Sequence, residues 1–347
     1  MSADDDADVK LPRETNVLFG HAQAEQAMLA AYKSGRVPHA WLIGGPPGVG
    51  KATLAYRFAR FVLAHPDPAA DAVQSATSLA VEPDDTVSRR VAAQAQSGLL
   101  VLERVINEQT GKLYTVIRID DVRRSVPFFG STAGEGGWRI AIVDSIDELQ
   151  RDGANALLKI LEEPPQRALL LLVSHAPGRE LPTIRSRCRR LLLRPLTESD
   201  VAHAVAAASR RPVDEAVLAA ARAAEGSVAR ALALLDEDAQ ELRRQTLDAM
   251  AQLPSADPRA VHAIGDALGS ADPQRLATFM DMVNGWLSAR LAQAGHNKTQ
   301  MARIADTWQT VNAAARDIEA YNLERKPFAF AVFAALAAAA AHSSHAP

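Results

Sequence analysis

Cysteine is nearly absent from this chain of 347 residues, which contains only Cys188. A single thiol cannot form an intramolecular disulfide or a zinc site that needs several thiolates. The sequence therefore predicts no zinc, no metal-ligating cluster and a reducing compartment. We expect Cys188 to be a small buried apolar side chain rather than a reactive thiol.

Long apolar runs and an excess of one charge are lacking as well. The acidic N-terminus MSADDDADVK is unlike a signal peptide, and the alanine-rich stretch 329–341 is too short and interrupted to span a bilayer. A net charge of −3 excludes a general basic field that would hold the protein on nucleic acid. We therefore predict a cytoplasmic protein without a membrane partner, in which any DNA contact comes from a local patch or through partner proteins.

Hydrophobic residues make up 48% of the chain, which is enough to bury the cores of two or three domains. Residues 1–14 are polar, and we expect them to be disordered. From residue 16 to 195, short apolar segments alternate with helical patterns, which predicts a parallel sheet with helices on both faces. The expected strands are 40–43, 99–104, 113–117, 138–143, 169–173 and 191–193, the second and third paired as a hairpin that turns at Gly111.

Everything after Pro195 is predicted to be helix and turn. Thr197 and Asp200 resemble a capping box at the start of the first of these helices. Breaks between the later helices are expected near residues 254–258, 269–273 and 295–298 and at Pro327. The predicted domains are 1–195, 196–236 and 237–347.

A phosphate-binding loop is predicted at residues 45–51, where the sequence GPPGVGK fits G-x-x-x-x-G-K between a strand and a helix. Gly45, Gly48 and Gly50 allow backbone N–H groups to turn toward a phosphate, and Lys51 adds a positive charge. The alternative, a glycine turn that merely closes a strand–helix corner, does not explain the lysine. We expect ATP or ADP to bind here.

Two residues needed for hydrolysis are missing from this loop and the strand beside it. Ala52 stands where a Ser or Thr hydroxyl would bind Mg²⁺, and Thr53 lies one residue further round the helix, about 100° away. Asp144 ends an apolar strand, as the second carboxylate site requires. Ser145 follows it where a glutamate would activate water, and serine is no general base near neutral pH. The sequence predicts a bound nucleotide that is not hydrolysed efficiently.

These segments together resemble the bacterial clamp-loader branch of the AAA+ proteins. The resemblance rests on His39, GGPPGVGK, IVDSIDELQRDGANALLKILEEPP and LPTIRSRC, and it covers residues 16 to about 235. It implies an α/β P-loop AAA+ module of 1–195, a small helical lid domain of 196–236 and an all-α collar domain of 237–347 that mediates oligomerisation.

The resemblance also implies roles for particular residues. Arg187, in the SRC motif of 186–188, would be an arginine finger that reaches into a neighbouring subunit's ATP site. The alternative is an ordinary surface arginine in a basic run. Ser174 occupies the sensor 1 position, where a polar side chain can reach the terminal phosphate. The sensor 2 arginine of the family falls at Ala229, and Arg230 beside it would face elsewhere.

A stator-like subunit of the DNA polymerase III clamp loader fits this combination of features. The partners implied are the delta and tau/gamma subunits in a hetero-pentamer. The chain would meet the sliding clamp and primer–template DNA through this complex, and it would be associated with the nucleoid through the replisome. An alternative is a motor-type, tau/gamma-like subunit that hydrolyses ATP itself, for example through Thr53. A stand-alone P-loop kinase or transporter ATPase would explain neither the SRC motif nor the helical C-terminal part.

Overall fold

The computed structural model describes residues 9–105, 114–130, 137–178, 180–269, 273–295, 297–321 and 323–341. It divides the chain into two compact units. The first holds the described residues 9–105 and 116–232, and the second holds the described residues from 233 to the last helix. The helices of the predicted lid up to Leu232 belong to the first unit, and a separate lid domain stays a prediction.

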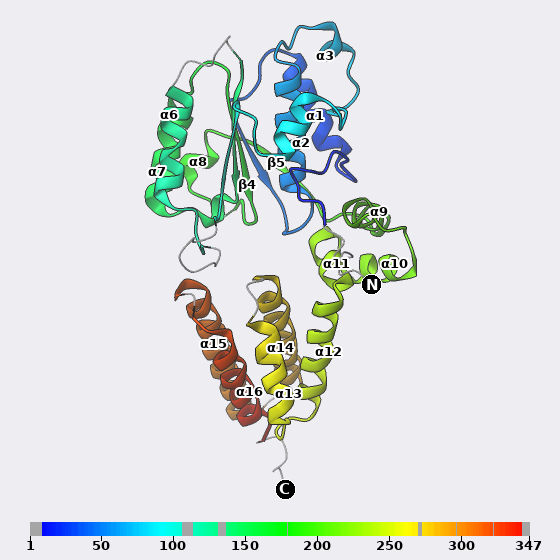
Figure 1. Ribbon diagram of the computed structural model, residues 1–347. Coiled ribbons are helices and arrows are strands. Elements are labelled where there is room, and N and C mark those ends of the chain that lie inside the picture. The colour runs from blue at the N-terminus through cyan, green and yellow to red at the C-terminus, as the bar shows by residue number, and fades with distance from the viewer. Residues whose placement is uncertain are drawn as a thin grey trace. The chain divides into compact units, whose positions relative to one another are not determined.

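A parallel sheet forms the centre of the first unit (Figure 1). Its strands lie in the order β2-β3-β4-β1-β5, and every neighbouring pair is parallel. Apolar side chains alternate between the two faces of each central strand and are buried on both, as crossover helices require. The bounds of the strands are β1 Ala40–Gly44, β2 Leu99–Glu103, β3 Arg139–Asp144, β4 Ala168–Ser174 and β5 Arg189–Leu192.

Each face of the sheet has its own core. One core joins Trp41, Ile43 and Leu171 to the helices α1 (Ala22–Lys33), α2 (Lys51–Ala64) and α4 (Thr86–Ala92). The other joins Leu42 and Leu170 to four helices of the opposite side, drawn to the left of the sheet in Figure 1. These are α5 (Ile119–Arg123), α6 (Ser125–Gly130), α7 (Arg151–Glu162) and α8 (Pro182–Arg185). The predicted α/β P-loop module is therefore confirmed.

Helices follow the sheet, as predicted. Within the first unit these are α9 (Glu198–Ser209), α10 (Glu215–Ala223) and the start of α11 (Val228–Leu235). The Thr197 side chain accepts a hydrogen bond from the Asp200 N–H at 3.1 Å, which caps α9. No described helix combines the length and the apolar character that a membrane crossing requires.

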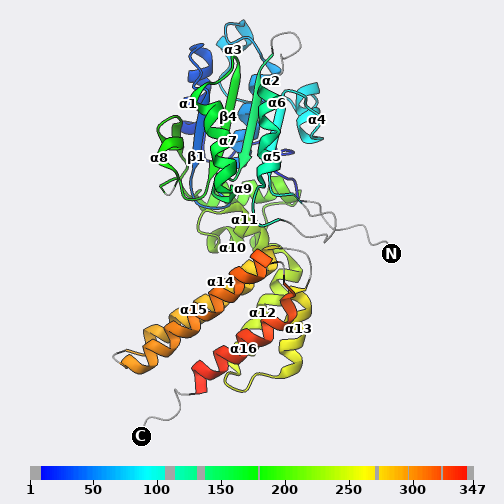
Figure 2. The same ribbon diagram turned by 90° about the vertical axis from the view of Figure 1, so that its left-hand side faces the viewer.

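The second unit is helical throughout its described part. Its core includes Phe279, Leu287, Val332 and Leu336. Figure 2 shows α13 and α16 side by side in this unit, where they are packed on each other. The helices are α12 (Glu237–Ala251), α13 (Pro258–Leu268), α14 (Pro273–Gln293), α15 (Lys298–Tyr321) and α16 (Arg325–Ala341).

Several expectations about local structure are wrong. Residues 99–103 form β2, but it pairs with β3 and not with a hairpin strand. In the expected second hairpin strand, residues 114–116 are irregular and Ile117 makes a single bridge to Leu149. Gly111, the expected turn, lies outside the described residues. The break expected around Pro327 is found, however: α15 ends at Tyr321 and α16 begins at Arg325, which places Pro327 in the first turn of α16, where a proline forfeits no helical hydrogen bond.

The expected disorder of residues 1–14 is wrong where the structure describes them. The Lys10 N–H donates to the Ala208 carbonyl at 2.9 Å, and the Glu14 N–H donates to the Leu11 carbonyl at 2.9 Å. Residues 1–8 lie outside the described part of the chain. A segment chosen as disordered for its polarity therefore packs on the domain, held by backbone hydrogen bonds that composition does not reveal.

Replacing Leu171, which is fully buried in β4, by alanine should destabilise the first unit by about 2–5 kcal/mol, because a cavity replaces packed methyl groups. Leu192→Ala is the matched control, since Leu192 is 66% exposed at the sheet edge and should change stability by less than about 0.5 kcal/mol. Chemical denaturation of the two variants compares them. Equal losses of stability would contradict the assignment of the core.

Candidate nucleotide-binding site

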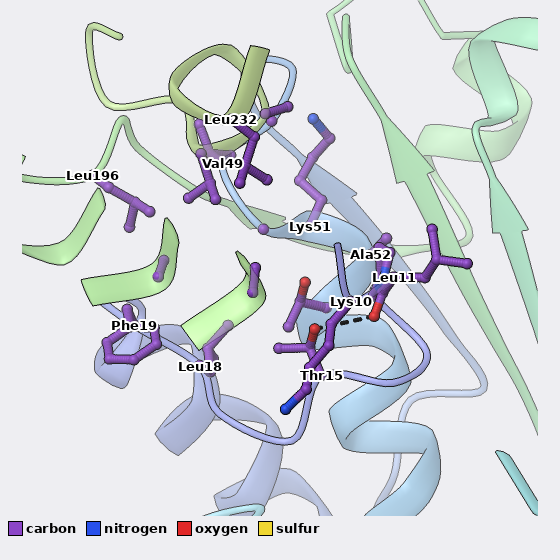
Figure 3. Close-up of a pocket in the computed structure, with 18 of the residues that line it drawn as sticks. Lys10, Leu11, Thr15, Leu18, Phe19, Val49, Lys51, Ala52, Leu196 and Leu232 are labelled. Atoms are coloured by element: carbon purple, nitrogen blue, oxygen red, sulfur yellow. Dashed lines mark hydrogen bonds between the residues drawn. The ribbon is translucent and has the colours of Figure 1, made fainter. Parts of the chain in front are cut away.

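A cavity of about 450 Å³ opens over the N-terminus of α2 (Figure 3). This volume falls in the range of small-ligand pockets. Its walls come from four parts of the first unit: the phosphate loop with the start of α2, residues 9–19 before α1, the helices α9 and α11, and the ends of β3 and β4. Gly48, Gly50, Lys51, Thr53 and Asp144, all predicted from the sequence, line it.

Glycines shape the loop between β1 and α2. Gly48 and Gly50 have φ values of +74° and +96°, a region that L side chains rarely adopt. A Cβ on Gly48 would also lie 2.2 Å from the Ser227 Oγ at the start of α11. The Val228 N–H donates to the Gly48 carbonyl at 2.8 Å. The loop is therefore bonded directly to α11, and any larger residue at 48 would force the two apart.

Lys51 is buried, with 4% of its surface exposed. Its Nζ donates to the carbonyls of Gly45 and Pro46 at 2.8 and 2.6 Å. Burial lowers the pKa of Lys51 to about 8, although the nearby carboxylates of Asp144 and Asp147 oppose this shift. Gly45 thus contributes a carbonyl to Lys51 and is not among the residues that line the cavity.

Asp144 ends β3 directly beside Glu103 of β2. Burial and the negative charge of Glu103 raise the pKa of Asp144 to about 6, and Lys51 opposes this shift. Ser145 follows with 2% of its surface exposed, and its Oγ has no hydrogen-bond partner among the described residues. The strand end therefore offers one carboxylate and no base in the position where hydrolysis would need it.

Residues 9–19, which we name the N-terminal strap, form a wall that the sequence did not predict. Figure 3 shows Leu11, Thr15, Leu18 and Phe19 of the strap around the cavity. The apolar residues Val9, Leu11, Val17, Leu18 and Phe19 in a polar segment were the available signal, but they follow no helical or strand period.

Buried cations on α2 hold the strap. The Arg60 side chain is 2% exposed and donates to the carbonyls of Arg13 at 2.8 Å and Thr15 at 3.4 Å. Arg57 donates to the Asn16 carbonyl and pairs with Glu25 at 2.6 Å. Two guanidinium groups thus satisfy main-chain carbonyls that would otherwise have no partner so close to the core.

His21 connects the end of the strap to the phosphate loop. Its Nε2 lies 2.7 Å from the Val49 carbonyl, and because a carbonyl can only accept, Nε2 carries the hydrogen. Burial lowers the pKa of His21, although the Val49 hydrogen bond opposes the shift. His21 is thus neutral at pH 7 and positions the loop through a hydrogen bond rather than a charge.

The sensor positions differ from their expected use. Ser174 is fully buried at the end of β4 and does not line the cavity. Its Oγ lies 3.1 Å from Asp147 and 2.9 Å from Glu180. Ala229 lines the cavity, whereas Arg230 pairs with Glu225 at 2.8 Å. The cavity therefore receives no arginine from this part of α11.

Arg187 is not among the residues that line the cavity. It lies just after α8 on the surface, and its side chain is 33% exposed. The guanidinium donates to the Thr183 carbonyl at 2.9 Å and pairs with Glu162, at the end of α7, at 2.8 Å. Cys188 beside it is partly buried, and burial raises the pKa of its thiol to about 12.

Comparison with known proteins gives a consistent set of relatives. A family model described as DNA polymerase III, delta subunit, matches residues 20–197. The chain is 37% identical over 150 residues to DNA polymerase III subunit delta' of Pseudomonas aeruginosa, covering 43% of this chain and 41% of the relative. It is 32% identical over 238 residues to the delta' subunit of Escherichia coli, covering 67% of this chain and 65% of the relative.

Gamma/tau subunits match as well. The DNA polymerase III subunit gamma/tau of Mycobacterium tuberculosis is 29% identical over 278 residues, covering 77% of this chain and 44% of the relative. The chain thus spans less than two thirds of the length of each of these three relatives.

Arg60→Met should release the strap while leaving the rest of the sheet domain intact, because it removes two hydrogen bonds to strap carbonyls and keeps most of the apolar side chain. Hydrogen exchange should then accelerate at the Lys10 amide, which is bonded to Ala208. Arg89→Met, at an exposed arginine of α4, is the control. Unchanged exchange of residues 9–19 in Arg60→Met would show that the strap is held by other contacts.

Proposed function

The chain belongs to the DNA polymerase III, delta subunit family, and from this premise we propose that it is the delta-prime subunit of a clamp-loader complex. In that complex it would work with delta and tau/gamma subunits to load the sliding clamp onto primed DNA. The matches to delta' subunits at higher identity than the gamma/tau match favour this role over a motor-type subunit. Its contribution would be an arginine donated to a neighbour's ATP site.

The position of Arg187 is the observation that carries the proposal. Arg187 is partly exposed and lies outside the cavity of its own chain, so it is not positioned to act on a nucleotide bound there. A guanidinium on the surface can instead meet a phosphate presented by another subunit, where its planar fork matches two phosphate oxygens. In the free chain Arg187 pairs with Glu162, an exposed pair that contributes little to stability and can exchange for a phosphate.

The cavity of the chain itself fits a nucleotide but not its hydrolysis. The glycine loop and Lys51 would hold the phosphates, and the strap and the apolar residues of α9 and α11 would surround the rest of the ligand. Lys51 would exchange its bonds with the Gly45 and Pro46 carbonyls for bonds to phosphate oxygens. Ala52 supplies no hydroxyl for Mg²⁺ and Ser145 no base, so we propose binding of ATP or ADP without efficient turnover.

Nucleotide affinity should fall as the pH rises through about 8. Lys51 has a pKa of about 8 in the free protein. Phosphates bind its charged form, so above pH 8 a proton must be taken up on binding and affinity weakens. Lys51→Arg, whose charge persists to higher pH, should show a flatter dependence between pH 7 and 9. Calorimetry with ATP measures the affinity of the wild type and of Lys51→Arg at each pH. A wild-type affinity that depends on pH as little as that of Lys51→Arg would refute the assigned role of Lys51.

The proposed function is tested in the assembled complex with Arg187→Ala. The variant should keep its fold and join its partners, because the side chain is partly exposed. Clamp- and DNA-stimulated ATPase should fall, since an arginine finger contributes about 10³–10⁵ to the rate at the site it serves. The loss should be partial, because other sites in the ring would receive arginines from other subunits.

Arg190→Ala, at an exposed arginine three residues further along, is the matched control and should load clamps normally. The isolated wild-type chain should turn over far below ~1 s⁻¹. Normal loading by the Arg187→Ala complex would overturn the proposal, and rapid ATP turnover by the isolated chain would favour the motor-type alternative.

A further inference from the structure

Glu180 lies in the loop between β4 and α8 and contacts the end of β4. Its Oε1 is 2.9 Å from the Ser174 Oγ at the end of β4. The same Oγ is 3.1 Å from the Asp147 Oδ1, which belongs to the turn after β3. One buried hydroxyl thus lies between two carboxyl groups.

The hydrogen atoms of this cluster can be counted. A serine hydroxyl carries one hydrogen and can donate to one carboxyl only, so the second contact is favourable only if the second carboxyl carries a proton. Asp147 accepts the backbone N–H groups of His175 at 2.6 Å and Ala176 at 3.0 Å, which stabilise its ionised form. Glu180 is therefore the group that holds the proton.

Glu180 also begins the segment that carries Arg187. Leu181, the next residue, precedes α8, and Ile184 of that helix is buried in the core at 1% exposure. The Arg187 N–H then donates to the Ile184 carbonyl at 3.1 Å, and its side chain donates to the Thr183 carbonyl at 2.9 Å. One short helix thus connects the Glu180 carboxyl to the Arg187 guanidinium.

We propose that Glu180, bonded in its protonated form to the Ser174 hydroxyl that also contacts Asp147, is a positioning residue for the Arg187 side chain. The inference rests on the proposed function of Arg187 and deepens it. Ser174, at the position where the family's sensor 1 residue would face a phosphate, instead anchors the segment that serves the neighbouring site. Release of the Glu180 carboxyl loosens the start of α8 and lowers the share of subunits whose Arg187 is correctly placed.

The surroundings of Glu180 determine how the cluster responds to pH. Asp147 faces it from the turn after β3 and Ser174 from β4, and Lys51 of α2 and the exposed residue His175 lie beyond them near Asp147. Arg185 of α8 donates to the Gly178 carbonyl at 3.2 Å. Burial, together with Asp147, raises the pKa of Glu180 to about 7, although the Ser174 hydrogen bond opposes this shift. The proton is present near pH 5 and is lost as the pH rises through about 7.

Glu180→Gln and Glu180→Ala, compared in the reconstituted complex, test the proposal. A glutamine amide can donate to the Ser174 Oγ as the protonated carboxyl does, which leaves the Ser174 hydroxyl free to donate to Asp147, and it does not titrate. Stimulated ATPase of the wild type should therefore match Glu180→Gln at pH 6 and fall below it as the pH rises to 8.5. Glu180→Ala should lower stimulated ATPase at all these pH values, by no more than the partial loss in Arg187→Ala, because misplacing a catalytic group costs at most what removing it costs. Glu163→Gln, which removes an exposed charge at the end of α7, is the control and should follow the wild type.

The double variant Glu180→Ala/Arg187→Ala distinguishes positioning from a general structural defect. If Glu180 acts through Arg187, the double variant loses no more activity than Arg187→Ala alone. A further loss of ATPase activity in the double variant would overturn the inference. So would a ratio of wild-type to Glu180→Gln ATPase activity that stays constant from pH 6 to 8.5.

Thermal unfolding of the isolated full chain provides a readout that needs no partner. The wild type should lose stability relative to Glu180→Gln as the pH rises from about 4.5 to 7, because the folded state alone retains the proton over that range. If Arg187→Ala leaves the complex fully active, the proposed function fails, whereas these melting curves still decide whether the carboxyl pair shares a proton. Parallel curves for the two chains would refute the shared proton.

Discussion

The parallel pairing of β1, β3 and β4 is the constraint on which the site depends. Parallel strands all end at the same edge, so the phosphate loop after β1, Asp144 after β3 and Ser174 after β4 meet there. The same edge is partly withdrawn from water, which lowers the pKa of Lys51 and raises that of Asp144. Each charge therefore depends on its neighbours, and the Lys51 ammonium donates to the backbone carbonyls of Gly45 and Pro46.

Binding and hydrolysis make separate demands on this edge, and the chain carries the residue types that only the first requires. A phosphate needs turned N–H groups and one positive charge, which the glycine loop and Lys51 provide. Transfer of the phosphoryl group also needs a metal ligand and a base, and Ala52 and Ser145 provide neither. The phosphate loop also has a structural role that needs no turnover, because its bond to α11 through Gly48 and Val228 helps to hold the domain together.

The sequence predicted the parts of the structure that repeat a local pattern. The apolar runs that became β1, β3 and β4 and the G-x-x-x-x-G-K loop each contain their own signal within a few residues. The strap contains no periodic pattern of this kind, because it is held by Arg57 and Arg60 from a helix some 45 residues away. The hydrogen bonds of Ser174 could not be predicted either, because they also join separate segments. Its position at a strand end was predictable, but its partners Asp147 and Glu180 belong to two other loops whose paths the sequence does not specify.

The bond between the Lys10 N–H and the Ala208 carbonyl has a consequence for the order in which the chain folds during synthesis. Translation delivers the strap first and its acceptor almost two hundred residues later. The strap can already dock on Arg60 when α2 has left the ribosome, but its outer end must wait until α9 is complete. Contacts of such high sequence separation form late because closing the intervening loop costs entropy before the contact forms. The wall of the cavity is thus completed only after the entire sheet has been synthesised, although it is built from the first residues of the domain.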